Sequence, residues 1–497
     1  MKKFILAIDQ GTTSTRVVIV DPENQSHLAS HQVELPQHFP APSQVEHDLK
    51  DIWNHTLTCI KEALIKAKIT GADIAAIGIT NQRETTCAFN KSGEPLARAI
   101  VWQDKRTADF CNTHKDKSES FRKITGLPLD PYFSATKMKW LLENNDQVKK
   151  ANAQNVLLFG TIDTFLLFKL TAGASYKTDA TNASRTLLLN LKNCSWDAEM
   201  LKFFTLKESN LPSVEDTFSN FGVTKNLSVL PDGIPILCLI GDQQSALLGQ
   251  ACTVEGMSKC TYGTGAFFLL NTGKNIKFSK HGLLSTVAYR YKSQTIYALE
   301  GASFIAGAGV QWFRDQLKAI KNSPEIEEQA NKIKDLKKVE QLFFFPFFSG
   351  LGSPYWKSDA LACIYGMSRD TGIAELSYAL LDGIAQSIAD LKEAAEKDIE
   401  KKIMAFHVDG GACKNNLLMQ IQANHNGSEV RRPTQVETTV SGAALGAQIQ
   451  LNNISPESLA TKQTFDAKFS PQTTDFFVNR RKKWHSLIQN IFLNNKH

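Results

Sequence analysis

Residues 4–21 read Phe4-Ile-Leu-Ala-Ile-Asp-Gln-Gly-Thr-Thr-Ser-Thr-Arg-Val-Val-Ile-Val-Asp21. Two apolar, β-branched runs at 4–9 and 16–21 flank a small polar segment at 10–15, and this pattern predicts a β-hairpin. Glycine and hydroxyl residues at its tip would leave backbone N–H groups open to an anion. A plain β-turn explains the segment equally well when it is taken alone.

A second segment of this kind follows the middle of the chain. Residues 259–271, Lys259-Cys-Thr-Tyr-Gly-Thr-Gly-Ala-Phe-Phe-Leu-Leu-Asn271, again place a Gly-Thr-Gly tip between two apolar runs. Two such loops favour nucleotide binding and predict two related lobes. The sequence has neither a Gly-x-x-x-x-Gly-Lys-Ser/Thr P-loop nor a Gly-x-Gly-x-x-Gly after a strand, so the common nucleotide fingerprints are absent.

Strand-like and helix-like patterns alternate from end to end, which predicts an α/β architecture. A chain of 497 residues is too long for one ordinary core. We therefore expect two lobes, residues 1–250 and 251–497. Helices are expected at residues 48–66, 136–145, 243–250, 305–318, 372–397, 415–424 and 440–451.

Composition narrows the class of protein. The net charge of +6 does not indicate a nucleic-acid partner, because the basic residues are spread among nearly as many acids. The one dense basic cluster, residues 480–483, is expected to be the solvated face of a helix.

The Phe-rich stretch 342–348 is broken by Pro346 and is expected to be a buried strand, with no membrane insertion. Asp9 interrupts the first apolar run too early for a signal peptide, and nine scattered cysteines without a Cys-x-x-Cys pair favour the cytoplasm.

Several charged residues follow expected strands. Asp9 ends the first strand beside the loop and suits Mg²⁺ held through water. Asp242 ends the apolar run 234–240 and precedes a helix, where a lone aspartate is more often an N-cap. Arg83 and Glu84 follow the strand at 77–80 and offer a bidentate donor and an acceptor to neighbouring hydroxyls. A surface ion pair would also explain that pair.

Two further features fit a ligand site. Trp102 and Tyr132 would supply apolar walls, although buried aromatics often belong only to the core. Gly410 and Gly411 stand between a strand and a helix within residues 406–416. They let the backbone approach a ribose or base while the helix N-terminus faces phosphates, or they form a tight turn.

Taken together, these segments resemble one family. The chain is similar along nearly its whole length to the FGGY carbohydrate kinases, a branch of the actin, hexokinase and heat-shock-chaperone ATPase superfamily. The similar segments are residues 9–16, 78–86, 101–103, 130–137 with Trp140, 241–244, 261–265 and 408–411, and the two family patterns fall at 132–144 and 362–382.

The resemblance implies two related actin-like (ribonuclease H-like) ATPase lobes, with mixed sheets flanked by helices and an active-site cleft between them. It also implies transfer of the γ-phosphoryl group of MgATP to glycerol by a cytoplasmic homo-oligomer, a dimer or a tetramer. Asp242 becomes the general base and, after Asp9, the second candidate ligand of Mg²⁺. The other implied polyol contacts are Arg83, Glu84, Trp102, Tyr132, Gln243 and Phe267. The implied ATP contacts are Thr12, Thr13, Ser14, Arg16, Thr264, Gly307, Gln311, Gly411 and Asn415.

The sequence lacks the features of two regulatory sites known in the family. Members that bind fructose 1,6-bisphosphate have a Gly-rich run with an arginine before the strand leading to the catalytic aspartate, and others are phosphorylated on a histidine there. Residues 225–234 have neither feature. Two alternatives stay open: an FGGY kinase acting on a ketopentose or another polyol, and an actin-like or chaperone-like ATPase that drives assembly or partner binding.

Overall fold

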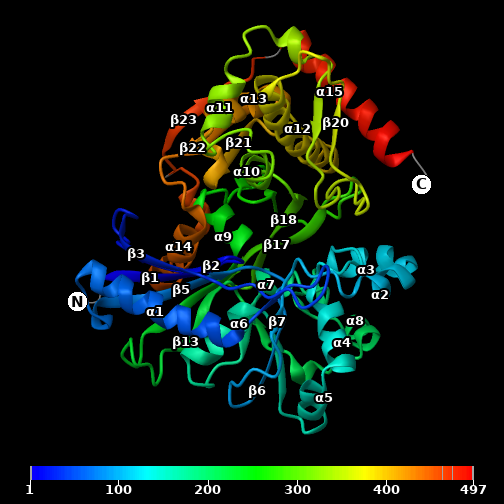
Figure 1. The fold of residues 1–497 in the computed structure, drawn as a ribbon. Helices are drawn as coiled ribbons and strands as arrows, with labels where there is room; N and C mark the ends of the chain where they lie inside the picture. The colour runs from blue at the N-terminus through cyan, green and yellow to red at the C-terminus, as the bar shows by residue number, and fades with distance from the viewer. Residues whose placement is uncertain (1–2, 462, 473, 495–497) are drawn as a thin grey trace.

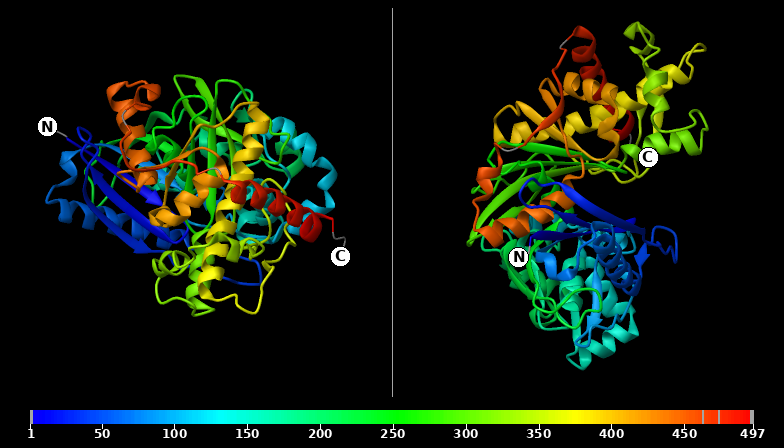
Figure 2. Two further views of the ribbon diagram at one scale, coloured as in Figure 1. Left: turned by 90° about the horizontal axis from the view of Figure 1, so that it is seen from above. Right: turned by 90° about the vertical axis from the view of Figure 1, so that its left-hand side faces the viewer.

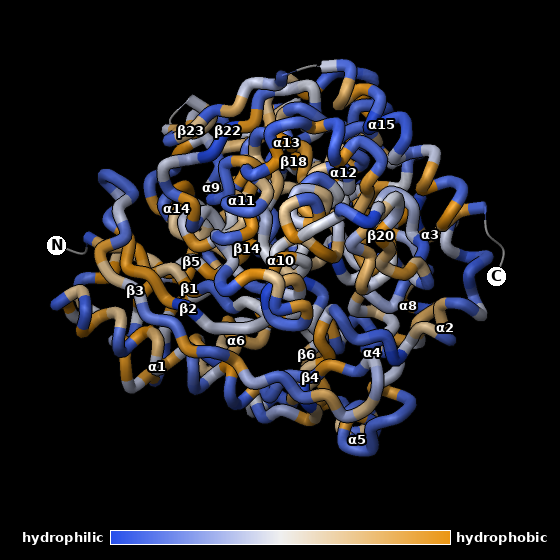
Figure 3. Tube along the Cα trace, turned by 45° about the horizontal axis from the view of Figure 1, so that its top comes forward, coloured by the Kyte–Doolittle hydropathy of each residue, from blue (hydrophilic) through white to orange (hydrophobic). Residues whose placement is uncertain are grey.

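The hairpin expected at residues 4–21 lies at the centre of a six-stranded sheet. The protein is described by a computed structural model that covers residues 3–461, 463–472 and 474–494. The sheet has the order β13-β14-β5-β1-β2-β3, in which β1 pairs antiparallel with β2 and parallel with β5. Its strands are β1 (Phe4–Gln10), β2 (Ser14–Val20), β3 (His27–Glu34), β5 (Ile74–Asn81), β13 (Phe218–Val223) and β14 (Pro235–Gly241). Figure 3 shows that the strands around β1 and β5 are largely hydrophobic, as their buried side chains require.

The second hairpin lies at the centre of a seven-stranded sheet, in the order β17-β18-β16-β15-β21-β22-β23. Figures 1 and 2 show the two sheets in separate lobes, one above the other. The strands are β15 (Ser258–Tyr262), β16 (Ala266–Gly273), β17 (Leu284–Tyr291), β18 (Gln294–Ser303), β21 (Ala405–Asp409), β22 (Glu429–Pro433) and β23 (Phe465–Phe469).

The two sheets repeat one order of parallel and antiparallel strand pairings, although the last two strands differ in chain order: β13 precedes β14, whereas β23 follows β22. The path β3-β2-β1-β5-β14-β13 corresponds strand for strand to β18-β16-β15-β21-β22-β23, with the same sequence of antiparallel and parallel pairings. In both sheets the hairpin strands are antiparallel, and a parallel strand joins the first of them. The prediction of two related α/β lobes with mixed sheets is therefore confirmed.

Each expected helix is present, with ends shifted by a few residues. For α1, Asp48 caps the N-terminus by accepting a hydrogen bond from the Lys50 N–H group at 2.8 Å, as its position before an apolar repeat suggests. The expected helices are α1 (Leu49–Ala67), α4 (Ser134–Asn144), α9 (Asp242–Gly249), α10 (Gly307–Asp315), α12 (Ile373–Ile399), α13 (Asn416–Asn426) and α14 (Thr438–Asn452). The others are α2 (Ala108–Thr113), α3 (Ser118–Thr125), α5 (Asp146–Ala153), α6 (Ile162–Leu170), α7 (Ala180–Ala183), α8 (Ala198–Phe204), α11 (Glu325–Ala330) and α15 (Asp475–Ile488).

Short strand pairs fill the connections. They are β4 (Glu46–His47) with β7 (Ala99–Ile100), β6 (Cys87–Asn90) with β8 (Leu157–Gly160), β9 (Lys177–Asp179) with β12 (Ser213–Glu215), β10 (Leu189–Asn190) with β11 (Ser195–Trp196), and β19 (Phe343–Phe345) with β20 (Cys363–Tyr365). The Phe-rich stretch contains the buried strand β19, as expected. Among the described residues, no helix has the length and apolar character that crossing a membrane requires.

Helix α14 belongs to the second half of the chain but packs on the first sheet. It contacts β1, β5, β14 and α9, and Figure 1 shows it beside β1 and β5. The strands of the first sheet all precede residue 250 and those of the second all follow it, whereas α14 returns to the first lobe. The division near residue 250 stays a prediction.

The expectation of a solvated basic face at residues 480–483 is wrong for its first half. Arg480 and Arg481 lie on α15 and are only 3% and 8% exposed. Their guanidinium groups pair with Asp382 at 2.8 Å and Asp390 at 2.7 Å, both on α12. These carboxylates compensate the buried charge, so the cluster fastens the C-terminal helix to the second lobe.

Candidate functional site

A cavity of about 480 Å³ lies between the two lobes. Residues from both halves of the chain line it, which matches the expected position of the cleft. Of the residues predicted from the sequence, those in the lining are Thr12, Thr13, Arg83, Glu84, Trp102, Tyr132, Asp242, Gln243, Thr264, Phe267 and Gln311. Gln37, Gln103, Gly265 and Phe304 also line it and were not predicted.

Three aromatic rings from separate parts of the chain form one wall of the cavity. The Trp102 ring meets Tyr132 at a centroid distance of 5.6 Å and Phe267 at 6.3 Å, both edge to face. The Trp102 indole N–H donates to the Thr12 hydroxyl at 2.9 Å, so this wall is tied to the first hairpin loop. The wall can shield a short carbon chain while leaving hydroxyl groups to polar residues.

Arg83 and Glu84 follow the carboxyl end of β5, at the floor of the cavity. Glu84 has a φ of 61°, a left-handed conformation that a side chain with a Cβ rarely adopts. Such a backbone conformation costs about 1–3 kcal/mol of stability, and it persists only where the surrounding structure holds it in place. Conformations of this kind are more frequent at functional sites. Both side chains are only 2% exposed, so the alternative of a surface ion pair does not apply.

The surroundings of this pair are a buried quartet of alternating charge. Both terminal nitrogens of Arg83 bind the two carboxylate oxygens of Glu300, at 2.5 and 2.9 Å. Arg185 binds Glu84 through Nε at 2.6 Å and approaches Glu300 through Nη2 at 3.2 Å. Two arginines and two glutamates therefore neutralise one another out of water, which is the condition for burying charge. Glu300 comes from β18 in the second lobe, so the quartet joins the lobes.

The quartet sets the protonation of its carboxyl groups. Burial would raise the pKa of Glu300, but Arg185 and Arg83 outweigh it and hold that pKa below its ordinary value. Burial also raises the pKa of Glu84, against the opposing charges of Arg185 and Arg83. Glu300 therefore stays ionised and compensates the charge of the two arginines.

Asp242 is the first residue of α9 and reaches the cavity beside Arg83. Its Oδ1 accepts a hydrogen bond from the Gln243 backbone N–H group at 2.7 Å and lies 2.9 Å from Arg83 Nε, without hydrogen-bond geometry to that nitrogen. Its side chain is 28% exposed. Among the contacts that the described residues make with Asp242, these two use Oδ1, which leaves Oδ2 to face a bound molecule.

Both hairpin loops contribute to the lining of the cavity. In the first, the Gly11 N–H group donates to the Ser14 carbonyl at 2.9 Å, which closes the tip. In the second, a Cβ at Gly265 would stand 2.7 Å from the Ser303 carbonyl, so only glycine allows the loop to approach β18 this closely. Thr12, Thr13 and Thr264 thus present hydroxyl groups from opposite lobes.

Asp9 stands where the first loop leaves β1. Burial raises the pKa of Asp9 to about 7, although Arg16 opposes the rise, and the Asp242 and Glu437 carboxylates add to it. The Asp9 carboxylate feels the negative charge of the Asp242 carboxylate, and Mg²⁺ prefers such oxygen ligands. Asp9 and Asp242 are therefore a suitable pair to hold Mg²⁺.

The remaining predicted nucleotide contacts, all within the described ranges, lie outside the cavity lining. Arg16 forms an ion pair with Glu437 and donates from Nε to Gln32 at 2.9 Å. Asn415 caps α13 by accepting from the Leu418 N–H group at 2.8 Å. The others are Ser14, which closes the first tip, Gly307, whose N–H group donates to the Gly263 carbonyl at 2.9 Å, and Gly411, where a Cβ would meet nothing within 4 Å.

The structure adds charged residues that the sequence did not predict. Besides Arg185 and Glu300, Lys137 is fully buried and donates to the carbonyls of Pro131 at 2.8 Å, Tyr132 at 2.9 Å and Trp102 at 3.5 Å. It thereby holds two aromatic residues of the wall, and burial lowers the pKa of Lys137 to about 8. Lys137 falls inside a segment of family resemblance, but nothing local signals Arg185 or Glu300.

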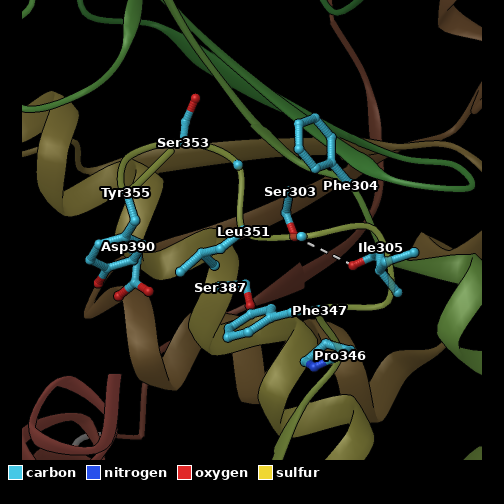
Figure 4. A pocket seen from close by; sticks show the side chains of 12 residues that line it. Ser303, Phe304, Ile305, Pro346, Phe347, Leu351, Ser353, Tyr355, Ser387 and Asp390 are labelled. Carbon is cyan, nitrogen blue, oxygen red and sulfur yellow. Dashed lines mark hydrogen bonds between the residues drawn. The ribbon is translucent and has the colours of Figure 1, made fainter. Parts of the chain in front are cut away.

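A much smaller cavity lies behind the main one. It has about 10 Å³, roughly the space of one water molecule. Phe304 lines both cavities, and Figure 4 shows it together with Ser303, whose hydroxyl donates to the Ile305 carbonyl at 3.4 Å. Tyr355 and Asp390 lie beside each other at its edge. Its size excludes an organic ligand.

Comparisons with known proteins show which family the chain resembles. Residues 4–249 match the FGGY family of carbohydrate kinases, N-terminal domain, and residues 258–451 match its C-terminal domain. A glycerol kinase of Myxococcus xanthus is 46% identical over 97% of this chain and 98% of its own length. A glycerol kinase of Bdellovibrio bacteriovorus is 44% identical over 99% and 100%. The crystal structure of Plasmodium falciparum glycerol kinase with ADP superposes with a TM-score of 0.90 at 35% identity, covering 99% of this chain and 98% of that one.

Proposed function

We propose a function from one premise: the chain belongs to the FGGY family of carbohydrate kinases. It transfers the γ-phosphoryl group of MgATP to glycerol, giving sn-glycerol 3-phosphate and ADP. The observation that carries the proposal is the cavity in which Arg83, Glu84 and Asp242 lie opposite the aromatic wall of Trp102, Tyr132 and Phe267. The relatives named glycerol kinase, similar over nearly the whole chain, support it.

Asp242 is the general base in this proposal. Oδ1 is occupied by the Gln243 N–H group and faces Arg83, so the carboxylate is oriented and Oδ2 accepts the proton of the attacking hydroxyl. Phosphoryl transfer depends mainly on positioning and charge neutralisation. The base therefore adds a factor of about 10²–10⁴ to a rate set largely by alignment.

The polyol lies against the aromatic wall. Arg83 and Gln243 donate hydrogen bonds to its hydroxyl oxygens, Glu84 accepts from a hydroxyl, and the Tyr132 hydroxyl completes the set. Trp102 and Phe267 cover the carbon chain. A three-carbon polyol suits this arrangement better than a longer sugar, because the rings and the buried quartet limit the space beside Asp242.

The nucleotide phosphates lie between the two hairpin loops. Mg²⁺ neutralises phosphate charge when it is bound. Asp9, through water, and Asp242 would hold it. Thr12, Thr13, Ser14 and Arg16 contact ATP from the first lobe. Thr264, Gly307, Gln311, Gly411 and Asn415 contact it from the second lobe. Closure of the lobes would bring Gly411 and Asn415 to the nucleotide and exclude water from the reaction.

The proposal includes a setting for the enzyme. All nine cysteines are free, which suits a reducing cytoplasm. A homo-oligomer, dimer or tetramer, follows from the family resemblance. The proposed lobes are residues 1–250, with the polyol site and catalytic aspartate, and 251–497, with the second loop and adenosine site.

The test is ADP formation from MgATP by the purified full-length chain, with and without glycerol. Dihydroxyacetone, other polyols and pentuloses serve as alternative acceptors. Strong stimulation by glycerol supports the proposal. Stimulation only by a pentulose or another polyol would overturn the assignment of glycerol. Turnover that depends on protein concentration or added peptide, and not on any acceptor, would favour the actin-like or chaperone-like alternative.

A further inference from the structure

Lys259 is a buried cation beside the proposed reaction site. It lies on β15, the strand that leads into the second hairpin loop, and its side chain is fully buried. It does not line the cavity, but it binds Gln243, which does. The Lys259 ammonium group donates to the Gln243 side-chain oxygen at 2.6 Å and to the Thr261 hydroxyl at 2.7 Å.

These two bonds determine which atoms of the partners remain free. An ammonium group can only donate, so it must meet the amide oxygen of Gln243 and not its NH₂ group. Gln243 lines the cavity, whereas Lys259 holds the amide oxygen from the interior. The NH₂ group is then the end of the amide that faces the cavity, and it can only donate.

We propose that Lys259 is a positioning residue of the reaction, which fixes the Gln243 amide so that its NH₂ group donates to a hydroxyl oxygen of the polyol. The inference rests on the proposed function and deepens it. Gln243 directly follows Asp242, so the hydroxyl that it holds is kept next to the general base. The bond to Thr261 holds the Lys259 ammonium group in place, and the bond from Lys259 to Gln243 connects the polyol site with β15, the strand of the second phosphate loop.

Burying a lysine costs free energy because its ammonium group is removed from water, and a positioning role would explain why the residue is kept there. A neutral hydrogen bond between a glutamine and a threonine could fill this space without removing a charge from water. The charged groups around Lys259 are Asp409, Asp242 and Arg83, together with the Cys260 thiol. Asp409 has a buried carboxylate oxygen without a hydrogen-bond partner among the described residues, and its charge offsets that of the ammonium group.

The test compares Lys259→Met with the wild-type chain. Methionine keeps an unbranched side chain of nearly the same length but removes the donor, which frees the Gln243 amide to turn. We expect the KM for glycerol to rise about ten- to a hundredfold, while ADP binding measured by calorimetry stays within about twofold. The matched control is Lys392→Met, which removes another buried lysine, on α12, that binds Glu396 at 2.6 Å. Its KM for glycerol should equal that of the wild type.

Two further variants separate positioning from a general loss of structure. If Lys259 acts through Gln243, the double variant Lys259→Met/Gln243→Leu should have the same KM for glycerol as Gln243→Leu alone. Gln243→Glu keeps an oxygen for Lys259 but removes the NH₂ donor, so its KM should rise as much as that of Gln243→Leu. This variant carries the test if Lys259→Met does not fold.

An unchanged KM in Lys259→Met would overturn the inference, as would fully additive effects in the double variant or a normal KM in Gln243→Glu. These outcomes presuppose a wild-type chain that responds to glycerol. A wild-type chain that forms no more ADP with glycerol than without it would overturn the proposed function, and this inference with it.

Discussion

At the scale of single residues, Arg83 connects the cavity to the joint between the lobes. Its Nε atom lies 2.9 Å from Asp242 Oδ1, and its two terminal nitrogens donate to Glu300 from the second lobe. The buried charges of Arg83 and Arg185 are stable only because the carboxylates of Glu300 and Glu84 compensate them. The position of a proposed polyol contact is therefore set by a residue more than two hundred positions away.

The first prediction concerns Glu300→Gln, which keeps the shape of the side chain but leaves two buried arginines with one carboxylate. We expect the free energy of unfolding to fall by about 3–5 kcal/mol. We also expect the KM for glycerol to rise at least about tenfold, because Arg83 loses its anchor. Denaturant unfolding and steady-state kinetics measure the two effects.

Glu396→Gln is the matched control, since it weakens the buried pair with Lys392, and neither residue lines the cavity. It should lower stability without changing the KM for glycerol. If Glu300→Gln behaves like this control, the quartet serves stability alone.

The sequence could predict part of this site and not the rest. Arg83, Glu84 and Asp242 each follow an apolar strand, and that local pattern marks residues at the carboxyl edge of a sheet. Arg185 and Glu300 have no such mark, because their role arises only when distant segments meet. The same reason explains Arg480 and Arg481: a run of basic residues predicts a solvated face, but Asp382 and Asp390 lie about a hundred residues away.

At the scale of elements, α9 and α14 form the closest helix contact at the site. A Cβ at Gly249 would stand 2.0 Å from the Thr438 carbonyl, and a Cβ at Gly442 would stand 1.9 Å from the Ser245 carbonyl. The Ser245 hydroxyl also donates to the Thr439 carbonyl at 2.6 Å. Because α9 begins at Asp242, its packing on α14 sets where the proposed base stands.

The second prediction is that Gly442→Ala destabilises the protein. In a helix interior this change usually stabilises by about 1 kcal/mol, so the sign of the effect is diagnostic. Here the new methyl group meets a backbone carbonyl, and we expect a loss of at least about 1–3 kcal/mol together with a reduced kcat. Gln450→Ala, on the same helix, should change neither. A more stable Gly442→Ala variant with normal kcat would show that the two helices do not need this close contact.

The positions of these helices were predictable to within a few residues, because caps and apolar repeats are local signals. Their partners were not. Nothing in residues 440–451 indicates that this helix returns to the first sheet, since an apolar face specifies burial but not the surface that buries it.

At the scale of the whole molecule, the shared path of six strands accounts for the shape seen in Figure 2. Each lobe contributes one hairpin loop, and the cavity lies where the two loops face each other. The alternation of strands and helices predicted the α/β class, and the two hairpin segments predicted two related lobes. The mixed sheets and the cleft between the lobes were implied by the family resemblance. The extra strand β17 at the edge of the second sheet had no counterpart in the pattern of the first half.

The third prediction concerns stability against pH. His407 on β21 lies within 3.4 Å of Cys252 Sγ and 3.3 Å of the Gln250 carbonyl, and burial lowers the pKa of His407 to about 4. The unfolded chain therefore binds this proton more readily, and the stability that neutral His407 contributes is lost as the pH falls from about 6.5 toward 4. We expect the difference in unfolding free energy between the wild type and His407→Gln to shrink over this range by up to about 3 kcal/mol. A constant difference between pH 7 and 4 would show that His407 is not held neutral by the fold.

In the proposed mechanism, the two lobes bring MgATP and glycerol to one carboxylate, that of Asp242. The most direct measurement is glycerol-dependent ADP formation by the wild type and by Asp242→Asn, with nucleotide binding followed by calorimetry. We predict strong stimulation of the wild type by glycerol, a kcat for Asp242→Asn lower by about 10²–10⁴-fold, and retained ADP binding. Near-normal turnover by Asp242→Asn, or a wild type whose ADP formation does not respond to glycerol, would contradict this mechanism.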